Sequence, residues 1–130
     1  MSVTAYFVAF LLLTVALLVS AVVTGMRAAR RAHLSIVVSA VVAMGLTIYF
    51  AERVGETLDV GAAGWVTPVH LWIAKITTVA YLLPIASGVR ALRGVGHRAA
   101  HRKLAFFVLG LTALTAVTGV AMVWLSEPGV

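Results

Sequence analysis

Four long stretches of apolar residues alternate with short polar links along the chain. They cover residues 3–25, 34–51, 66–89 and 104–125. A helix needs about 20 mostly apolar residues to cross the hydrocarbon core of a bilayer. The pattern therefore predicts four membrane-spanning helices. Because the links are too short to hold a soluble domain, we expect residues 1–130 to form one transmembrane domain.

The composition agrees with this pattern and excludes several classes of protein. Of the 130 residues, 62% are hydrophobic and 11% are charged, whereas a soluble domain usually has about 25% charged residues. This difference excludes a disordered chain, a nucleic-acid-binding domain and almost any soluble enzyme. The chain has no cysteine, which excludes disulfides, thiolate metal sites and iron–sulfur clusters.

The charged residues predict how the helices are oriented. Most of the cations lie in or beside the first and third links: Arg27, Arg30, Arg31, Arg90, Arg93, Arg98, Arg102 and Lys103. The acids lie on the opposite side: Glu52, Glu56, Asp59 and Glu127. An excess of Lys and Arg marks cytoplasmic loops, so both termini are expected outside. The basic residues are interpreted as topology signals that touch anionic lipid headgroups. Alternatively, they form a surface on which a protein docks.

The two halves of the chain are similar around their basic links. Residues 24–30, Thr-Gly-Met-Arg-Ala-Ala-Arg, resemble residues 87–93, Ser-Gly-Val-Arg-Ala-Leu-Arg. Each basic link then ends in Ala-His, at His33 and at His101. We therefore expect an all-α four-helix bundle in the membrane. It would consist of two parallel-oriented helical hairpins, N-out and C-out, related by a pseudo-twofold axis along the membrane normal.

The histidines that open the second and fourth helices form the first candidate site. Under this repeat, His33 and His101 are symmetry mates at one depth. Ionisable residues at membrane depth are functional candidates, and neutral imidazole is the commonest metal ligand. Two facing histidines suit a haem iron with two axial ligands or a first-row metal. Alternatively, both lie at the interface and cap helices or bind headgroups. His97, in the third link, is an accessory candidate.

A second candidate site lies at the outer ends of the second and third helices. Glu52 closes the second helix, and His70 lies about one turn into the third. A histidine with a carboxylate can begin a zinc, copper or iron site, which water, a nearby acid or a partner protein would complete. Tyr49, one turn below Glu52, is an accessory candidate. The alternative is an interfacial ion pair of Glu52 with His70 or Lys75.

The third stretch contains one charge and one proline. Lys75 is the single charge well inside a predicted span. We expect it to extend toward the headgroups, to pair with Glu52 or Glu56, or to take part in a proton relay. Pro84 predicts a kink, because proline has no N–H to bond the carbonyl of Ala80.

Four runs of residues carry a resemblance to a known family. They are Arg-Arg-Ala-His at 30–33, Thr-Pro-Val-His-Leu at 67–71, His-Arg-Lys-Leu-Ala at 101–105 and Thr-Gly-Val at 118–120. From about residue 24 to residue 125, the chain resembles the small four-helix membrane proteins of the CtaM or YozB-like type. That family is linked to the assembly of haem-copper cytochrome oxidases in bacteria.

The resemblance implies a helper that binds a metal or haem or hands it over to the oxidase. It makes His33, His70 and His101 the candidate ligands. The chain departs from the family at one position, because the family tends to have a histidine after the tyrosine near the end of the second helix. Here Tyr49 is followed by Phe50, Ala51 and Glu52.

One function and two alternatives follow. The leading hypothesis is a metal- or haem-binding protein of the bacterial inner (plasma) membrane that assists maturation of a respiratory oxidase. It would not itself be a turnover enzyme. Its cofactor would be haem b or a copper, iron or zinc ion. Its partners would be the lipid bilayer and an oxidase subunit, without nucleic acid, and a homo-oligomer is compatible with the sequence.

The first alternative is a small b-type cytochrome that carries electrons, with His33 and His101 as axial ligands. The second alternative is a structural subunit that packs in a larger membrane complex. In that case its histidines would bind neither metal nor haem.

Overall fold

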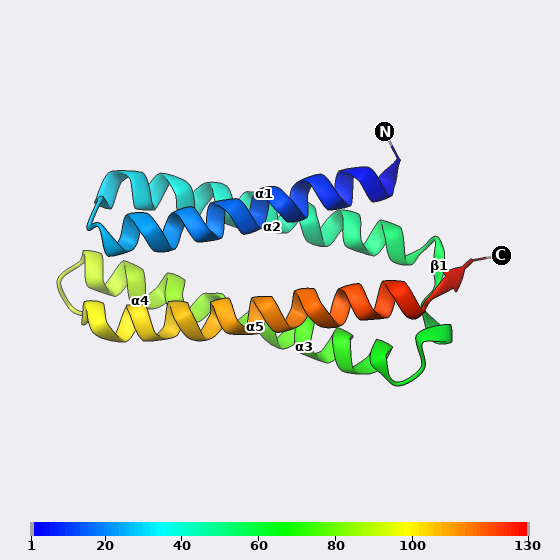
Figure 1. The fold of residues 1–130 in the computed structure, drawn as a ribbon. Helices are drawn as coiled ribbons and strands as arrows, with labels where there is room; N and C mark the ends of the chain where they lie inside the picture. The colour runs from blue at the N-terminus through cyan, green and yellow to red at the C-terminus, as the bar shows by residue number, and fades with distance from the viewer. Residues whose placement is uncertain (1, 130) are drawn as a thin grey trace. The chain divides into compact units, whose positions relative to one another are not determined.

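A computed structural model describes residues 2–129 and consists almost entirely of helices (Figure 1). In chain order its elements are α1 (Val3–Met26), α2 (Arg30–Gly55), β1 (Leu58–Asp59), the 3-10 helix η1 (Val60–Ala63), α3 (Val66–Ala80), α4 (Leu82–Leu92), α5 (Arg98–Leu125) and β2 (Glu127–Pro128). The two short strands pair with each other.

Four helical runs are long and apolar enough to cross a membrane. They are Val3–Met26, Arg30–Gly55, Val66–Leu92 and Arg98–Leu125. A run of 24 residues is about 36 Å long, which exceeds the hydrocarbon thickness of about 30 Å. The prediction of an all-α chain with four helices long and apolar enough to span a membrane is therefore confirmed.

Two of these helices begin earlier than predicted. α2 begins at Arg30 and α5 at Arg98, whereas the apolar stretches begin at residues 34 and 104. Arg, Lys and Ala are good helix formers, so the basic residues continue the helix beyond its apolar part. As a result, His33 and His101 are each the fourth residue of their helix.

The chain divides into two compact units. The first unit holds residues 2–58 and Gly129, and its helices α1 and α2 pack side by side. The second unit is Asp59–Pro128, in which α3 and α4 pack against α5. Each unit is a helical hairpin with an antiparallel course (Figure 1).

The third spanning helix is interrupted where Pro84 predicts it. α3 ends at Ala80 and α4 begins at Leu82, with Tyr81 as the connecting residue. Proline cannot donate a hydrogen bond to the carbonyl four residues before it. The N–H of Ile85 still donates to the Tyr81 carbonyl at 3.4 Å, so the helix resumes within one residue. The predicted kink is confirmed as a break between two helices.

Both units make their basic turn in the same way. α1 is followed by Ala28 with φ +54°, and α4 by Gly94 with φ +74°. In each turn, the N–H of the left-handed residue donates to a carbonyl three residues earlier, at 3.2 Å. The N–H of the next residue donates to a carbonyl five residues earlier. This is the Schellman ending of a helix, and it directs the chain back along the hairpin.

Each unit also places one threonine pair between its helices. Thr14 Oγ1 of α1 lies 2.9 Å from Thr47 Oγ1 of α2, and Thr77 Oγ1 of α3 lies 2.8 Å from Thr115 Oγ1 of α5. Thr14 and Thr77 are buried. Between apolar helices in lipid, hydroxyl pairs of this kind hold the helices together and fix their register.

Valine substitutions are expected to show this coupling in the first unit. In a double-mutant cycle of Thr14→Val and Thr47→Val, the coupling free energy should be about 0.6 kcal/mol, the average for interhelical hydrogen bonds in a membrane protein. Unfolding in a detergent titration measures it. Ser39→Ala is the control partner for Thr14→Val, because the Ser39 hydroxyl donates to the Ser35 carbonyl of its own helix. A coupling free energy of zero for the threonine pair would show that the two hydroxyls do not bond each other across the helices.

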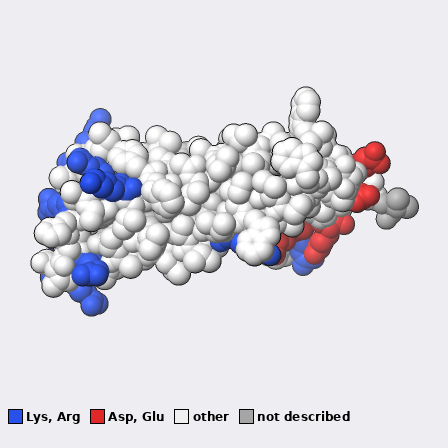
Figure 2. All heavy atoms as spheres, turned by 90° about the horizontal axis from the view of Figure 1, so that it is seen from below, with Lys and Arg blue, Asp and Glu red and all other residues white. Residues whose placement is uncertain are grey.

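Most of the charged residues lie toward the ends of the helices, with Lys and Arg gathered at one end and Asp and Glu at the other (Figure 2). In the first unit, Arg27, Arg30 and Arg31 lie at the turn, and Glu52 and Glu56 lie at the other end of α2. In the second unit, the end of α4 and the start of α5 carry basic residues, whereas Asp59 precedes η1 and Glu127 follows α5. Each hairpin therefore has a basic end, at its turn, and an acidic end.

Candidate histidine sites

His33 packs against α1 at the basic end of the first unit. Its ring faces Gly25, where an added Cβ would lie only 3.2 Å from Cε1 of the ring. Its Nδ1 lies 2.9 Å from the Ala21 carbonyl oxygen and 3.4 Å from Thr24 Oγ1. A larger residue than glycine at position 25 would therefore push the ring away from its hydrogen-bond partners.

His101 packs against α4 at the basic end of the second unit in the same manner. A Cβ added to Gly88 would lie 3.1 Å from Cε1 of the ring. Nδ1 of His101 lies 3.0 Å from Ser87 Oγ, and the Ser87 hydroxyl lies 3.1 Å from the Pro84 carbonyl. In both units, therefore, the histidine ring contacts a hydroxyl residue and the glycine that follows it.

The register of these contacts repeats between the units. Thr24 follows the paired Thr14 by ten residues, and Ser87 follows the paired Thr77 by ten. On the opposite helices, Thr47 follows His33 by fourteen residues, and Thr115 follows His101 by fourteen. The similarity found between the two sequence halves therefore extends to the packing within each hairpin.

His70 makes a third contact of the same kind, at the acidic end of the second unit. Its Nδ1 lies 3.0 Å from Thr118 Oγ1. A Cβ added to Gly119 would lie 2.9 Å from Cε1 of the ring. This is the closest approach of the three. The side chain is half-buried, like those of His33 and His101.

At His33 the hydrogen bond determines which ring nitrogen carries the proton, and at His101 and His70 the contacts fit the same tautomer. A carbonyl oxygen only accepts, so Nδ1 of His33 donates its hydrogen to Ala21. The hydroxyls of Ser87 and Thr118 also lie within hydrogen-bond distance of carbonyls of their own helices, and when they donate there, their oxygens accept from Nδ1–H of His101 and His70. In a neutral ring with its proton on Nδ1, the lone pair lies on Nε2, the nitrogen that binds metal in this tautomer.

The acidic end of the first unit has aromatic residues where the second unit has His70. In the repeat register, Phe7 corresponds to His70, and Phe50 corresponds to Thr118. The Phe50 ring stacks on Tyr6 and Phe10, with centroid distances of 5.2 and 5.4 Å. The two hairpins therefore share the histidine contact at their basic ends and differ at their acidic ends.

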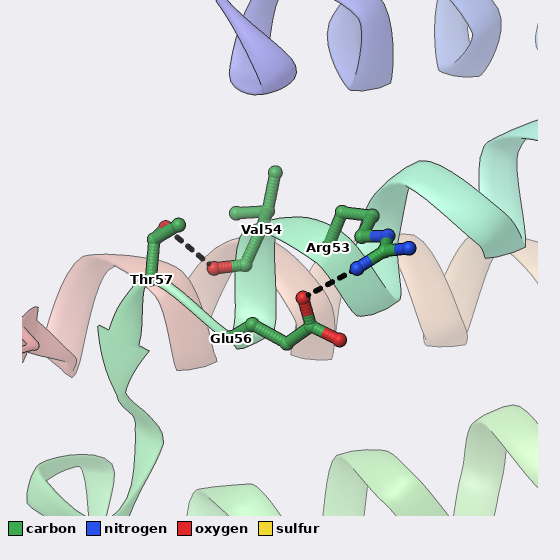
Figure 3. Close-up of polar contacts among 4 residues, drawn as sticks. All are labelled: Arg53, Val54, Glu56 and Thr57. Carbon is green, nitrogen blue, oxygen red and sulfur yellow. Dashed lines mark hydrogen bonds and ion pairs between the residues drawn. The ribbon is translucent and has the colours of Figure 1, made fainter.

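The remaining candidates near the end of α2 make other contacts. Arg53 pairs with Glu56 at 3.1 Å, so this acid is engaged within its own helix (Figure 3). Arg53 also lies over the Tyr49 ring, 5.5 Å from its centroid, and Tyr49 packs edge-on against Phe50. Glu52 is exposed. Tyr49 is therefore part of an aromatic and cationic surface cluster.

The distances along the helices separate the predicted ligands within each unit. His33 and Glu52 are nineteen residues apart on α2, which corresponds to about 28 Å. His101 and Gly119, the contact of His70, are eighteen residues apart on α5, or about 27 Å. Across residues 2–129, no three His, Asp or Glu side chains gather as a metal cluster would.

The predicted pairs, His33 with His101 and Glu52 with His70, each join residues of the two units and stay predictions. His97 is exposed and precedes the first residue of α5. The hydroxyl and glycine residues that contact the histidine rings were not predicted from the sequence. The signal was present, because Thr-Gly or Ser-Gly occurs at residues 24–25, 87–88 and 118–119.

The chain matches no protein-family model, no curated protein and no solved structure.

Proposed function

We propose that this chain is a membrane protein that binds a haem iron or a transition-metal ion through histidine and serves the maturation of a respiratory haem-copper oxidase. The observation that carries the proposal is the repeated fixation of Nδ1 at three histidines. A ligating histidine usually donates its other ring N–H to a carbonyl, carboxylate or water, which sets the ring orientation and raises the basicity of the ligand nitrogen. His33 donates in this way to Ala21.

The three histidines suit a haem iron or an ion in transit better than a closed zinc site. A closed zinc site takes all its ligands from protein side chains, and residues 2–129 contain no cluster of that size. A haem iron takes most of its ligands from the macrocycle and needs one or two histidines. An ion in transit likewise takes its remaining ligands from water or from the receiving protein. His33, His101 and His70 are the residues that would hold either group, which supplies one-electron chemistry when it is iron or copper.

The charge distribution supports the orientation included in this proposal. The basic ends of both hairpins would lie in the cytoplasm, following the excess of Lys and Arg in cytoplasmic loops. The hairpins would then be parallel-oriented, with both termini outside, in a bacterial inner membrane. The acidic ends, with His70 and Glu52, would face the outer side.

The link to an oxidase comes from the resemblance to the CtaM or YozB-like proteins. The histidine contacts support the second implication of that resemblance, that histidines are the ligands. A b-type cytochrome is the second candidate function. The observation that favours it is that the second unit holds a fixed histidine at each end, His101 and His70. Such a pair suits electron carriage between the two membrane faces.

Absorption spectroscopy with elemental analysis of the purified protein tests the proposal. The protein is expressed in a bacterial membrane with haem and metal supplied, purified in mild detergent, and measured oxidised and reduced. A variant with alanine at His33, His70 and His101 serves as the comparison. We expect haem absorption or stoichiometric copper, iron or zinc in the unaltered protein and loss of most of it in the triple variant.

A second measurement addresses the oxidase. In a host whose copy of this chain is deleted, terminal oxidase activity of the membranes should fall, and the unaltered chain should restore it whereas the triple variant should not. A stable redox spectrum with unchanged oxidase activity would replace the maturation function with the cytochrome. Equal haem and metal contents in both proteins, together with unchanged oxidase activity, would leave a packing subunit and overturn the proposal.

A further inference from the structure

The second unit has an open apolar groove with a single cation at one end. It is lined by residues of α3, α4 and α5 and has a volume of about 620 Å³. We call it the Lys75 groove, and its lining residues are Trp72, Lys75, Ile76, Val79, Ala80, Leu82, Leu83, Phe107 and Leu111. None of the histidine contacts described above involves these residues.

Lys75 is the one charged residue of this lining. Within residues 59–128, no carboxylate forms an ion pair with it. Its side chain is exposed on a helix long and apolar enough to span the membrane. A charge at membrane depth is costly unless it reaches water, a headgroup or a counter-charge, and an anionic headgroup would give Lys75 two of these together.

The direction of the lysine side chain indicates where that anion lies. Lys75 is nine residues beyond Val66, the first residue of α3, which places its Cα about 14 Å along the helix. Its Nζ lies 5.6 Å from the centroid of the Trp72 ring, one turn nearer the start of α3. The ammonium group therefore reaches back toward the start of α3. Tryptophan is enriched at the membrane–water interface, where lipid phosphates lie, and long Lys side chains direct their charge there.

The rest of the groove runs the other way, into the membrane. From Trp72 to Leu83 it follows eleven residues of helix, which is about 16 Å at the rise of an α-helix. One leaflet of a bilayer contributes about half of the 30 Å hydrocarbon core. The groove thus matches the depth of one leaflet, with its cation at the headgroup level and apolar side chains below.

We propose that the Lys75 groove binds an anionic phospholipid. Its phosphate pairs with the Lys75 ammonium beside Trp72, and one acyl chain lies along Ile76, Val79 and Leu83 toward Phe107. The charge favours an anionic headgroup over a zwitterionic one, whose own ammonium group repels Lys75. The open, shallow and wholly apolar remainder suits a flexible chain in a leaflet.

Quenching of Trp72 fluorescence by brominated lipids tests this proposal. Trp65→Phe and Trp124→Phe leave Trp72 as the single tryptophan. This protein is reconstituted in phosphatidylcholine vesicles that contain increasing fractions of brominated phosphatidylglycerol or of brominated phosphatidylcholine. We expect half-maximal quenching at a fraction about fivefold lower for the anionic lipid, since one lysine near an anionic lipid surface contributes on the order of 1 kcal/mol.

Three variants in the same background make the test specific. Lys75→Gln should remove the preference, so that both lipids quench alike, whereas Lys75→Arg should keep it. Lys103→Gln removes a cation from the basic end of the same unit and should leave the preference unchanged. Far-ultraviolet circular dichroism confirms that each variant keeps its helices before the comparison is made.

Several results would overturn the proposal. They are equal quenching by the two lipids in the unaltered groove, a preference that survives Lys75→Gln, or a preference that Lys103→Gln removes equally. Energy transfer between differently labelled copies that disappears in Lys75→Gln, without any lipid preference, would show instead that a second copy of the chain covers the groove.

Discussion

Alanine at His33 or at His101 is expected to lower the haem or metal content of the purified protein more than tenfold. Losing an outer hydrogen-bond partner of a ligand already costs about 10–100-fold in metal affinity, and these substitutions remove the ligand nitrogen itself. The two residues occupy equivalent positions in their hairpins, each the fourth residue of its helix and each against a glycine. The two variants should therefore have effects of similar size.

His97→Ala is the matched control for these variants. It removes an imidazole from an exposed position just before α5, so it should leave the haem or metal content within error of the unaltered protein. Absorption spectra and elemental analysis on the same samples give the measurement. If His33→Ala and His101→Ala retain the content that His97→Ala retains, the basic ends of the hairpins hold no ligand.

Gly119→Ala is expected to weaken binding at His70 by about 10–100-fold, the range for loss of a positioning contact. The added Cβ would lie 2.9 Å from Cε1 of the ring, so the ring must move away from α5. That movement lengthens the bond between Nδ1 and Thr118 Oγ1, now 3.0 Å. The stability of α5 should not fall, because alanine is a better helix former than glycine by about 1 kcal/mol.

Gly110→Ala provides the control on the same helix, since nothing lies within 4 Å of its added Cβ. It should leave binding unchanged and keep or raise the resistance to unfolding. Titration of each variant with haem or a metal ion measures the affinity. Nitrogen NMR of the histidine ring reports whether Nδ1 of His70 still carries the proton. An unchanged His70 signal and affinity in Gly119→Ala would show that the close glycine contact does not position this ring.

The helices of this protein could be predicted from sequence because apolar length is a sufficient signal in a membrane. The positions where the helices begin and end were predicted with unequal accuracy. Pro84 predicted the end of α3 at Ala80, because proline has no N–H to donate to the carbonyl four residues before it. The starts of α2 and α5 were predicted too late, since hydropathy falls at the basic residues whereas Arg and Ala continue the helix beyond its apolar part.

The candidate site was predictable in its residue types and less so in its contacts. Ionisable residues within an apolar stretch or at the start of its helix single out His33, His70 and His101. Their partners depend on how the facing helices are rotated, and one sequence does not determine that rotation. The glycine that admits a ring and the hydroxyl that bonds it, as at Ser87 and Gly88, become meaningful only when the opposite helix is in place.

The difference between the acidic ends of the two hairpins has a consequence for stoichiometry. The basic end of each hairpin has one histidine packed on a glycine, whereas the acidic end has His70 in the second hairpin and stacked Tyr6, Phe10 and Phe50 in the first. Counting the histidines that pack on a glycine, the first hairpin thus offers one imidazole and the second offers two, and this inequality distinguishes the two hairpins as ligand donors in a way that a perfect repeat would not.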